Sequence, residues 1–353
     1  MPLLRPLVPA LVLLVLACAG PSSPPSESST GAAETGGLTG PYLGQPTPSL
    51  IPEIFAPGLV STGMAERDLA MTPEGDEIYY TGVLGAGFDF SAILVVRQVD
   101  GAWTEPEVAS FSGRFKDLEP AISPDGDRLF FVSYRPAAED GGPPSEDEDI
   151  FMTTRQADGW SEPFRLGPPI NSESPEFFPS VARDGSLYFT RRSADRTEAI
   201  YRSRWTDGAW EPAAKLGPEV NAAPTQFNAF IDPDERFLIV CSWGREDSLG
   251  GVDYYIVYRN PDDTWEGPFN LGERINTAAG QEWSPYVSPD GQYFFFMSSR
   301  TTLAERAASQ PMTYDGMHTS HLEPMNGNSD IWWVDASFLQ ELRPAAEPAE
   351  AGS

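Results

Sequence analysis

The stretch that decides the fold runs from Ser284 to Arg300 and reads Ser-Pro-Tyr-Val-Ser-Pro-Asp-Gly-Gln-Tyr-Phe-Phe-Phe-Met-Ser-Ser-Arg. A short apolar segment leads into Pro289-Asp290-Gly291, and a second apolar segment follows it. Proline presets φ at the first corner of a turn, aspartate hydrogen-bonds its own backbone, and glycine accepts positive φ. The pattern therefore predicts two antiparallel strands joined by a tight turn. Tyr293 to Met297 are apolar throughout, so we expect this strand to be buried on both faces.

The same strand-turn-strand unit recurs four more times along the chain. The other copies have their first strands at Met71, Ile122, Val181 and Ile231, equivalent to Val287 of the last copy. One turn follows another after roughly 50 to 60 residues, which leaves room for four short strands in each period. A near-regular period of this length predicts the blades of a β-propeller.

A second motif lies in the other half of most periods. It consists of an Asp-Gly type of turn followed by a tryptophan and then a proline, with the tryptophans at Trp103, Trp160, Trp210 and Trp265. Aromatic side chains contribute much of the apolar area of a small core. We therefore expect each tryptophan to pack between neighbouring blades rather than to bind a ligand.

Residues 51–62 supply a strand that the last period lacks. Their pattern of proline, apolar residues, Gly and Pro matches residues 162–172, the outermost strand of the second period. The last period ends at Ile331-Trp-Trp-Val-Asp-Ala without such a segment. An N-terminal fourth strand would close the ring and remove an exposed sheet edge. The sequence thus predicts an all-β, five-bladed β-propeller closed by an N-terminal strand, and little sequence remains for a sixth blade.

The N-terminus has the features of a bacterial export signal. Arg5 precedes an apolar run from Leu7 to Leu16 that is too short to span a bilayer. Val15-Leu16-Ala17-Cys18 resembles the lipobox of bacterial lipoproteins. That resemblance implies a signal peptide over residues 1–18, lipidation of Cys18 and, because alanine follows the cysteine, transfer to the outer membrane. The alternative is ordinary cleavage in this region and secretion of a soluble protein.

The remaining composition suggests the domain limits. Residues 19–48 are rich in Ser, Pro, Gly, Thr and Ala, which predicts a flexible tether. The propeller is expected over residues 49–342, and the Ala, Glu and Pro of residues 343–353 predict a disordered tail. Cys241 lies in an apolar run and is expected to be an inert, buried thiol.

The net charge of −29 limits the partners. It argues against nucleic acid and against anionic lipid surfaces, so the lipid anchor is the one membrane contact expected. The sequence contains no Gly-x-Ser-x-Gly elbow and no phosphate-binding glycine loop. We therefore predict no cofactor; a cation in the central channel and the oligomeric state stay open.

Alternation of strand direction separates two faces of the ring. The Pro-Asp-Gly turns share one face, termed the turn face. The entries to the inner strands share the other, termed the working face, together with the insertions at residues 136–148 and 303–329. Binding concentrates in loops on a rigid scaffold, so the working face is the expected binding face.

Carboxylates recur at equivalent positions before the inner strands. Five residues before Met71 and its equivalents stand Glu66, Asp117, Glu176, Gln226 and Glu282; three residues before them stand Asp68, Glu119, Phe178, Asn228 and Ser284. We expect the first set, with Arg300, to form a negative, ligand-binding ring at the channel mouth, where like charges raise one another's pKa. Such a ring suits a cation or a basic side chain. Glu66, Asp68, Glu119, Glu176 and Glu282 are also candidate acid/base residues of a glycosidase. The alternative is that these residues only cap the strands and bind water.

Both histidines lie in the last insertion. His318 and His321 are followed by Glu323, and imidazole with carboxylate suits copper or zinc. The alternative is that this insertion forms a lid over the channel.

The repeats at residues 122–131 and 287–296, with the Ser-x-Arg and Asp-Ile-aromatic elements of their blades, resemble the WD40-like repeats of TolB-type bacterial propellers. The resemblance covers roughly residues 51–342 and implies a periplasmic propeller of the cell envelope that binds proteins. TolB-type propellers have six blades and a separate N-terminal domain, whereas this chain shows five periods and no such domain. Since propellers host many activities, two functions stay open. One is an envelope lipoprotein that binds a protein or cell-wall-linked partner, and the other is a glycosidase-like enzyme.

Overall fold

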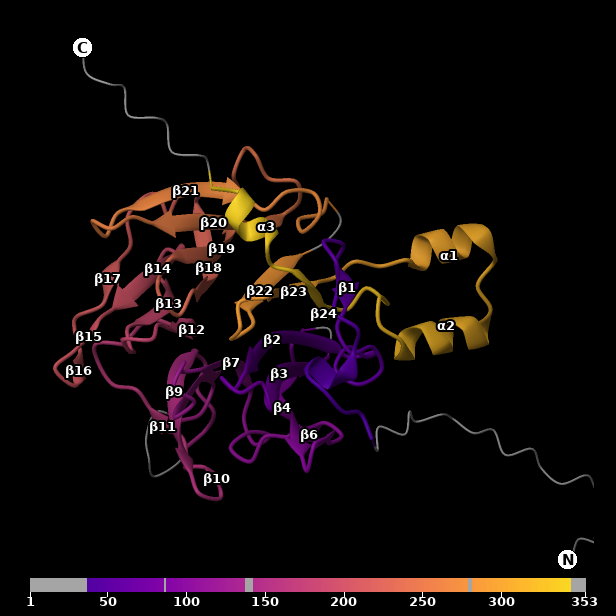
Figure 1. Ribbon diagram of the computed structural model, residues 1–353, viewed down its shortest axis with the longest axis horizontal. Helices are drawn as coiled ribbons and strands as arrows, with labels where there is room; N and C mark the ends of the chain where they lie inside the picture. The colour runs from indigo at the N-terminus through magenta and orange to yellow at the C-terminus, as the bar shows by residue number, and fades with distance from the viewer. Residues whose placement is uncertain (1–36, 86, 137–141, 279–280, 344–353) are drawn as a thin grey trace, which may run out of the picture. The chain divides into compact units, whose positions relative to one another are not determined.

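The computed structural model describes residues 37–85, 87–136, 142–278 and 281–343, which belong to one compact unit. These residues form an all-β, five-bladed β-propeller in which the sheets are arranged in a ring (Figure 1). The predicted fold class is therefore confirmed. The predicted signal peptide, Cys18 and residues 344–353 lie outside the described residues. No helix among the described residues is long and apolar enough to cross a membrane.

Four blades are built from consecutive segments, each running from the channel outward. Blade one contains β2 (Ala65–Met71), β3 (Glu77–Leu84), β4 (Phe90–Val99), β5 (Ala102–Trp103) and β6 (Glu107–Val108). Blade two contains β7 (Asp117–Ile122), β8 (Arg128–Ser133), β9 (Asp149–Gln156), β10 (Gly159–Trp160) and β11 (Phe164–Arg165). Blade three contains β12 (Glu176–Val181), β13 (Leu187–Arg192), β14 (Glu198–Ser203) and β17 (Ala214–Lys215), with a small hairpin of β15 (Trp205–Thr206) and β16 (Ala209–Trp210). Blade four contains β18 (Thr225–Ile231), β19 (Phe237–Trp243), β20 (Val252–Arg259) and β21 (Trp265–Asn270).

Blade five joins the two ends of the propeller. It contains β22 (Glu282–Val287), β23 (Tyr293–Ser298) and β24 (Asp330–Asp335), and its outer strand is β1 (Glu53–Ile54). β1 runs antiparallel to β24, with Glu53 opposite Trp333. The backbone N–H of Phe55 continues this pairing and donates to the carbonyl of Ile331 at 2.9 Å. The predicted closure of the ring by an N-terminal strand is therefore confirmed.

Aromatic packing reinforces this short pairing. The Phe55 ring is fully buried, and its centroid lies 5.1 Å from that of Phe295 and 5.2 Å from that of Trp333. Tyr42, in the short helix η1 (Tyr42–Gly44), contacts the Tyr293 ring at 5.0 Å. Ordered packing therefore extends into residues 37–48, which composition alone predicts as part of a flexible tether.

The tryptophans of the repeat join neighbouring blades, as predicted. Trp160 of blade two donates its indole N–H to the Tyr79 hydroxyl of blade one at 2.7 Å. Trp210 of blade three lies 6.1 Å from Phe130 of blade two. Trp265 of blade four packs in a core cluster with residues of blade three. Each outer hairpin thus rests on the blade before it.

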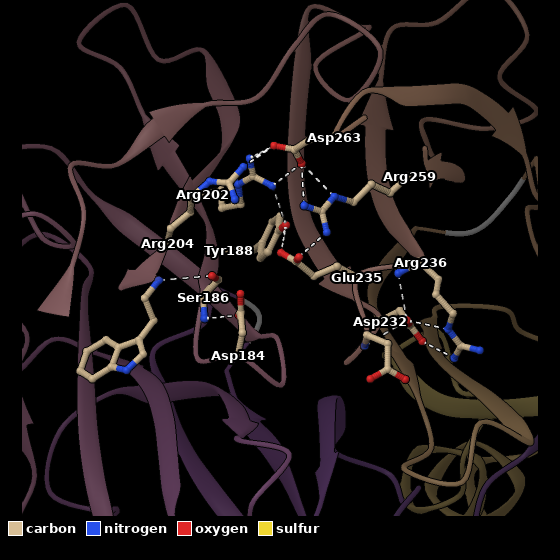
Figure 2. Close-up of polar contacts among 12 residues, drawn as sticks. Asp184, Ser186, Tyr188, Arg202, Arg204, Asp232, Glu235, Arg236, Arg259 and Asp263 are labelled. Atoms are coloured by element: carbon tan, nitrogen blue, oxygen red, sulfur yellow. Dashed lines mark hydrogen bonds and ion pairs between the residues drawn. The ribbon is translucent and has the colours of Figure 1, made fainter. Parts of the chain in front are cut away.

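Polar contacts at the turn face also join the blades. Figure 2 shows the contacts between blades three and four, in which Arg202 and Arg259 both donate to Asp263, at 2.9 and 2.8 Å. The Tyr188 hydroxyl donates to Glu235 at 2.5 Å. Hydrogen bonds from Arg202 and Arg259 hold the pKa of Asp263 well below its usual range. This side of the ring is therefore braced by ion pairs that persist in mild acid.

The remaining helices lie at the edge of the ring. α1 (Leu303–Ser309) and α2 (Tyr314–Leu322) form a hairpin that stands beside blade five, and α3 (Phe338–Glu341) follows β24 (Figure 1). The side chains of Asn326 and Asn328, which follow the hairpin, donate to the Gly63 carbonyl at 3.0 and 2.9 Å. Cys241 is a buried free thiol, as predicted.

Shortening Phe55 tests the closure of the ring. Phe55→Ala removes a fully buried ring at the junction of β1 and blade five, and we expect it to lower the free energy of unfolding by about 3–5 kcal/mol. Ile51→Ala is the matched control, because Ile51 is 71% exposed and should change stability by less than about 0.5 kcal/mol. Urea titration measures both, and equal midpoints for the two variants would contradict the closure.

Candidate functional site at the central channel

Every inner strand carries a β-bulge at the same place. The pairing register shifts there in all five blades. The bulged residues have φ between 49° and 62° without being glycine, and they are Asp68, Glu119, Phe178, Asn228 and Ser284. Positive φ is uncommon for such residues, and a bulge redirects the side chains beside it. These five residues, termed the waist residues, line the channel.

An ion cluster joins several blades at the waist. Arg67 is only 5% exposed, and its Nε donates to both carboxylate oxygens of Asp68 at 2.8 and 2.7 Å. Its Nη2 donates to Glu119 at 2.9 Å, and the other Glu119 oxygen accepts the backbone N–H of Phe178 at 2.7 Å. The Ser284 hydroxyl donates to Asp68. The cluster therefore connects blades one, two, three and five across the channel.

Burial controls the charge of this cluster. It raises the pKa of Glu119 from 4.5 to about 8, because the opposing attraction of Arg67 is smaller than the cost of desolvation. Burial alone would lower the pKa of Arg67, but Asp68 and Glu119 hold it above its ordinary value. The guanidinium of Arg67 is therefore charged at neutral pH.

The waist separates two cavities. The cavity towards the turn face has a volume of about 160 Å³, and its walls are mainly prolines and aliphatic side chains. The cavity towards the working face, termed the working-face pocket, has a volume of about 430 Å³ and receives side chains from all five blades. Its residues include Arg67, Lys116, Tyr134, Phe177, Asn228 and Trp283. Glu119 contacts both cavities, which places the ion cluster between them.

The predicted ring of Glu66, Asp117, Glu176, Gln226 and Glu282 occupies a different place. All five side chains are at most 1% exposed, and none lines either cavity. Glu66 accepts the backbone N–H of Thr62 at 3.1 Å, and Glu176 accepts that of Ser172 at 3.0 Å and Nε of Arg191 at 2.7 Å. Glu66 and Glu176 thus cap the connections that enter blades one and three, and the five buried side chains form no open negative funnel at the mouth.

Arg300 also contacts a connection between blades. Its Nη2 donates to the carbonyls of Arg274, at 3.2 Å, and Ile275. Its guanidinium lies 5.2 Å from the centres of the Phe296 and Trp332 rings. Arg191 contacts the carbonyl of Ile170 in the same way at 2.9 Å. The structure thus places Arg300 as a brace between blades four and five.

The histidine-containing insertion is remote from the channel. His318 and His321 lie on α2, and the Glu323 carboxylate is 3.5 Å from the Arg306 guanidinium. Within the described ranges, no three His, Cys, Asp or Glu side chains form a group that could hold a metal ion. No residue of the α1–α2 hairpin lines either cavity. The hairpin therefore does not form the lid over the channel that was the alternative to a metal site.

Sequence reasoning missed most of the residues that line the working-face pocket, although Glu119 was a candidate. One residue before each waist residue stand Arg67, Leu118, Phe177, Phe227 and Trp283, and all five line this pocket. The sequence does carry a signal for these residues, because the position four residues before Met71 and its equivalents is apolar or aromatic in four of the five repeats. It lies between the two columns that carry the carboxylates.

Comparisons with known proteins assign this chain to no family. No protein-family model and no curated protein matches the sequence. Among solved structures, TolB from Acinetobacter baumannii is similar at a TM-score of 0.44 and 16% identity, over 77% of this chain and 57% of that chain. A TolB-type protein from Agrobacterium tumefaciens gives a TM-score of 0.42 and 16% identity, over 76% and 90%. The NanB sialidase from Streptococcus pneumoniae gives 0.40 and 13%, over 72% and 36%. The chain thus spans 57% of the length of the Acinetobacter TolB.

Removing the cation of the waist cluster tests its contribution to stability. Arg67→Met leaves Asp68 and Glu119 buried without their guanidinium, so we expect a loss of about 3–5 kcal/mol in the free energy of unfolding. Adding Asp68→Asn and Glu119→Gln removes the two acids and should restore most of the loss. Urea titration of the single and triple variants checks this, and a single variant within about 1 kcal/mol of wild type would contradict the cluster.

Stability should fall as the pH rises through neutrality. Burial raises the pKa of Glu66 and Glu282 from 4.5 to about 7, and that of Asp330 from 3.8 to about 7. Between the ordinary and the raised values the folded state binds more protons than the unfolded state, so the free energy of unfolding decreases with pH. The stabilisation is complete below about pH 4 and is lost by about pH 8, on the order of 1–3 kcal/mol for each group.

Glu66→Gln should flatten this dependence, because glutamine is neutral at every pH. The control Glu74→Gln replaces an exposed glutamate and should keep the wild-type slope. Urea midpoints at pH 5 and pH 8.5 measure both. A wild-type protein that is equally stable at the two pH values would contradict the assignment of these buried acids.

Proposed function

We propose that this chain is a cell-envelope lipoprotein, anchored to the outer membrane through Cys18, whose propeller binds a protein or cell-wall-linked partner. The observation that carries the proposal is the working-face pocket, into which every blade sends the side chain that precedes its waist residue. A pocket built from all five blades has rigid walls, and rigid walls lower the cost of ordering a binding surface.

The walls of the pocket suit a macromolecular partner. Leu118, Phe177, Phe227 and Trp283 provide apolar area of the kind that dominates binding hot spots. The rim is held in place, because Arg192 donates to Glu148 at 3.1 Å and to Glu198 at 2.9 Å. An apolar centre with a fixed polar rim is the usual anatomy of a protein interface.

The sequence supports the location. The lipobox-like segment that ends at Cys18 would supply the anchor, and the Ser/Pro/Gly-rich residues that follow it would separate the propeller from the membrane. The net charge of −29 would keep the propeller itself away from anionic lipid. The working face would then be free to meet a partner.

The alternative of a glycosidase-like enzyme would depend on Asp68 and Glu119. Glu66, Glu176 and Glu282 line neither cavity, whereas Asp68 and Glu119 lie at the floor of the turn-face cavity. Both of these carboxylates already bind Arg67. If the chain is such an enzyme, a glycan hydrolysis screen will detect turnover that Glu119→Gln abolishes.

Capture of partners from envelope extracts tests the scaffold proposal. Leu118→Arg places a charge on the wall of the pocket, and Val108→Arg makes the same type of change at an exposed position in blade one. After chemical cross-linking, we expect wild type and Val108→Arg to capture the same partner in similar amounts. We expect Leu118→Arg to capture at least tenfold less of that partner. A Leu118→Arg protein with wild-type melting temperature and undiminished capture would refute the proposed site.

A further inference from the structure

The cations of the working-face pocket are unequally paired. Arg67 binds Asp68 and Glu119, and Arg192 binds Glu148 and Glu198. Lys116 is one of the two lysines in the chain, and it forms no ion pair with any described residue. Its ammonium lies 5.0 Å from the centre of the Tyr134 ring. An ammonium held over an aromatic face, with its donors free, is a ready partner for an anionic group.

The carboxylates of the pocket are already occupied. One Glu148 oxygen accepts the Tyr134 hydroxyl at 2.8 Å, and the other accepts Arg192. Glu119 is shared between Arg67 and the backbone N–H of Phe178. A basic ligand would therefore have to displace an existing guanidinium, whereas an acidic ligand would not. The pairing favours a ligand with a negative charge.

Two further polar atoms of the pocket residues lack partners in the described part of the chain. Asn228 is 2% exposed, and its Oδ1 accepts no hydrogen bond. The indole N–H of Trp283 is buried and donates to no acceptor. The two residues come from neighbouring blades, and the Phe227 and Trp283 rings lie 6.1 Å apart. One free acceptor and one free donor on neighbouring blades match one amide group, which offers both an N–H and a C=O.

The apolar wall of the pocket adds a third kind of contact to the free ammonium and the two unpartnered polar atoms. Phe177 of blade three and Phe227 of blade four line the pocket, while Lys116 comes from blade two. A ligand that reaches all of these groups carries an apolar side chain, an amide and a carboxylate. The end of a polypeptide chain has these three features in adjacent positions.

From this arrangement we infer that the working-face pocket binds the C-terminal residue of a polypeptide partner. Lys116 Nζ binds the terminal carboxylate, Asn228 Oδ1 and Trp283 Nε1 bind the last amide, and the final side chain packs against Phe177 and Phe227. This inference rests on the proposed function and specifies the chemistry of the partner. Capture of a C-terminal carboxylate is a known mode of peptide recognition.

Affinity selection with two peptide pools tests the inference. The full chain is immobilised and offered random hexapeptides with a free C-terminal carboxylate, or the same pool amidated at the C-terminus. We expect enrichment of peptides with an apolar last residue from the first pool and at least tenfold less recovery from the second. Equal recovery from both pools, or none from the first, would overturn the assignment of a terminal carboxylate.

Matched variants locate the contacts. Lys116→Met should abolish the difference between the pools, whereas Lys215→Met, at the other and exposed lysine, should preserve it. Trp283→Phe keeps an aromatic ring but removes the N–H, and it should weaken binding of a selected peptide three- to tenfold. Wild-type affinity in Lys116→Met would overturn the inference. The proposed function would still stand if the cross-linked partner remained sensitive to Leu118→Arg, so the two failures are distinguishable.

Discussion

The pairing of β1 with β24 is the contact on which the rest of the propeller depends. It joins the two ends of the ring through few backbone hydrogen bonds, so its strength comes from the packing of Phe55 against Phe295 and Trp333. Closure also places blade one against blade five, where the Met71 backbone N–H donates to the Tyr286 hydroxyl at 3.0 Å. The waist cluster needs this neighbour, because Ser284 of blade five donates to Asp68 of blade one. The closure of the ring and the ion cluster at the waist are therefore parts of one arrangement.

The ion cluster at the waist determines how the channel can bind a partner. Arg67 between two carboxylates is favourable only because all three groups are bound and buried together. The ion cluster lies between the two cavities and so forms the floor of the working-face pocket. The pocket above that floor combines apolar walls with a polar rim, which is a geometry for holding part of a partner.

The sequence predicted the ring well because its signals are local. The Pro-Asp-Gly turns specify hairpins, the period specifies blades, and the missing strand of the last period specifies closure by residues near Ile54. The candidate site was harder, since the expected orientation of the carboxylates assumed regular strands. A bulge beside Asp68 changes which side chains enter the channel, so Glu66 faces a connection while Arg67 reaches the axis. Positive φ at Asp68 or Glu119 leaves no mark in sequence composition, unlike positive φ at a glycine. The Gly and Pro content of residues 37–48 likewise predicts a flexible segment, although Tyr42 and Leu43 pack against the core.

Native-state hydrogen exchange at the Phe55 amide tests the central claim most directly. This N–H donates to the Ile331 carbonyl, so its exchange reports on closure alone. If the ring is closed as described, the Phe55 amide will exchange with a free energy of opening close to that of the amides in β23 and β24. Rapid exchange at Phe55, with β23 and β24 still fully protected, would show that blade five is stable without the N-terminal strand and would contradict the account.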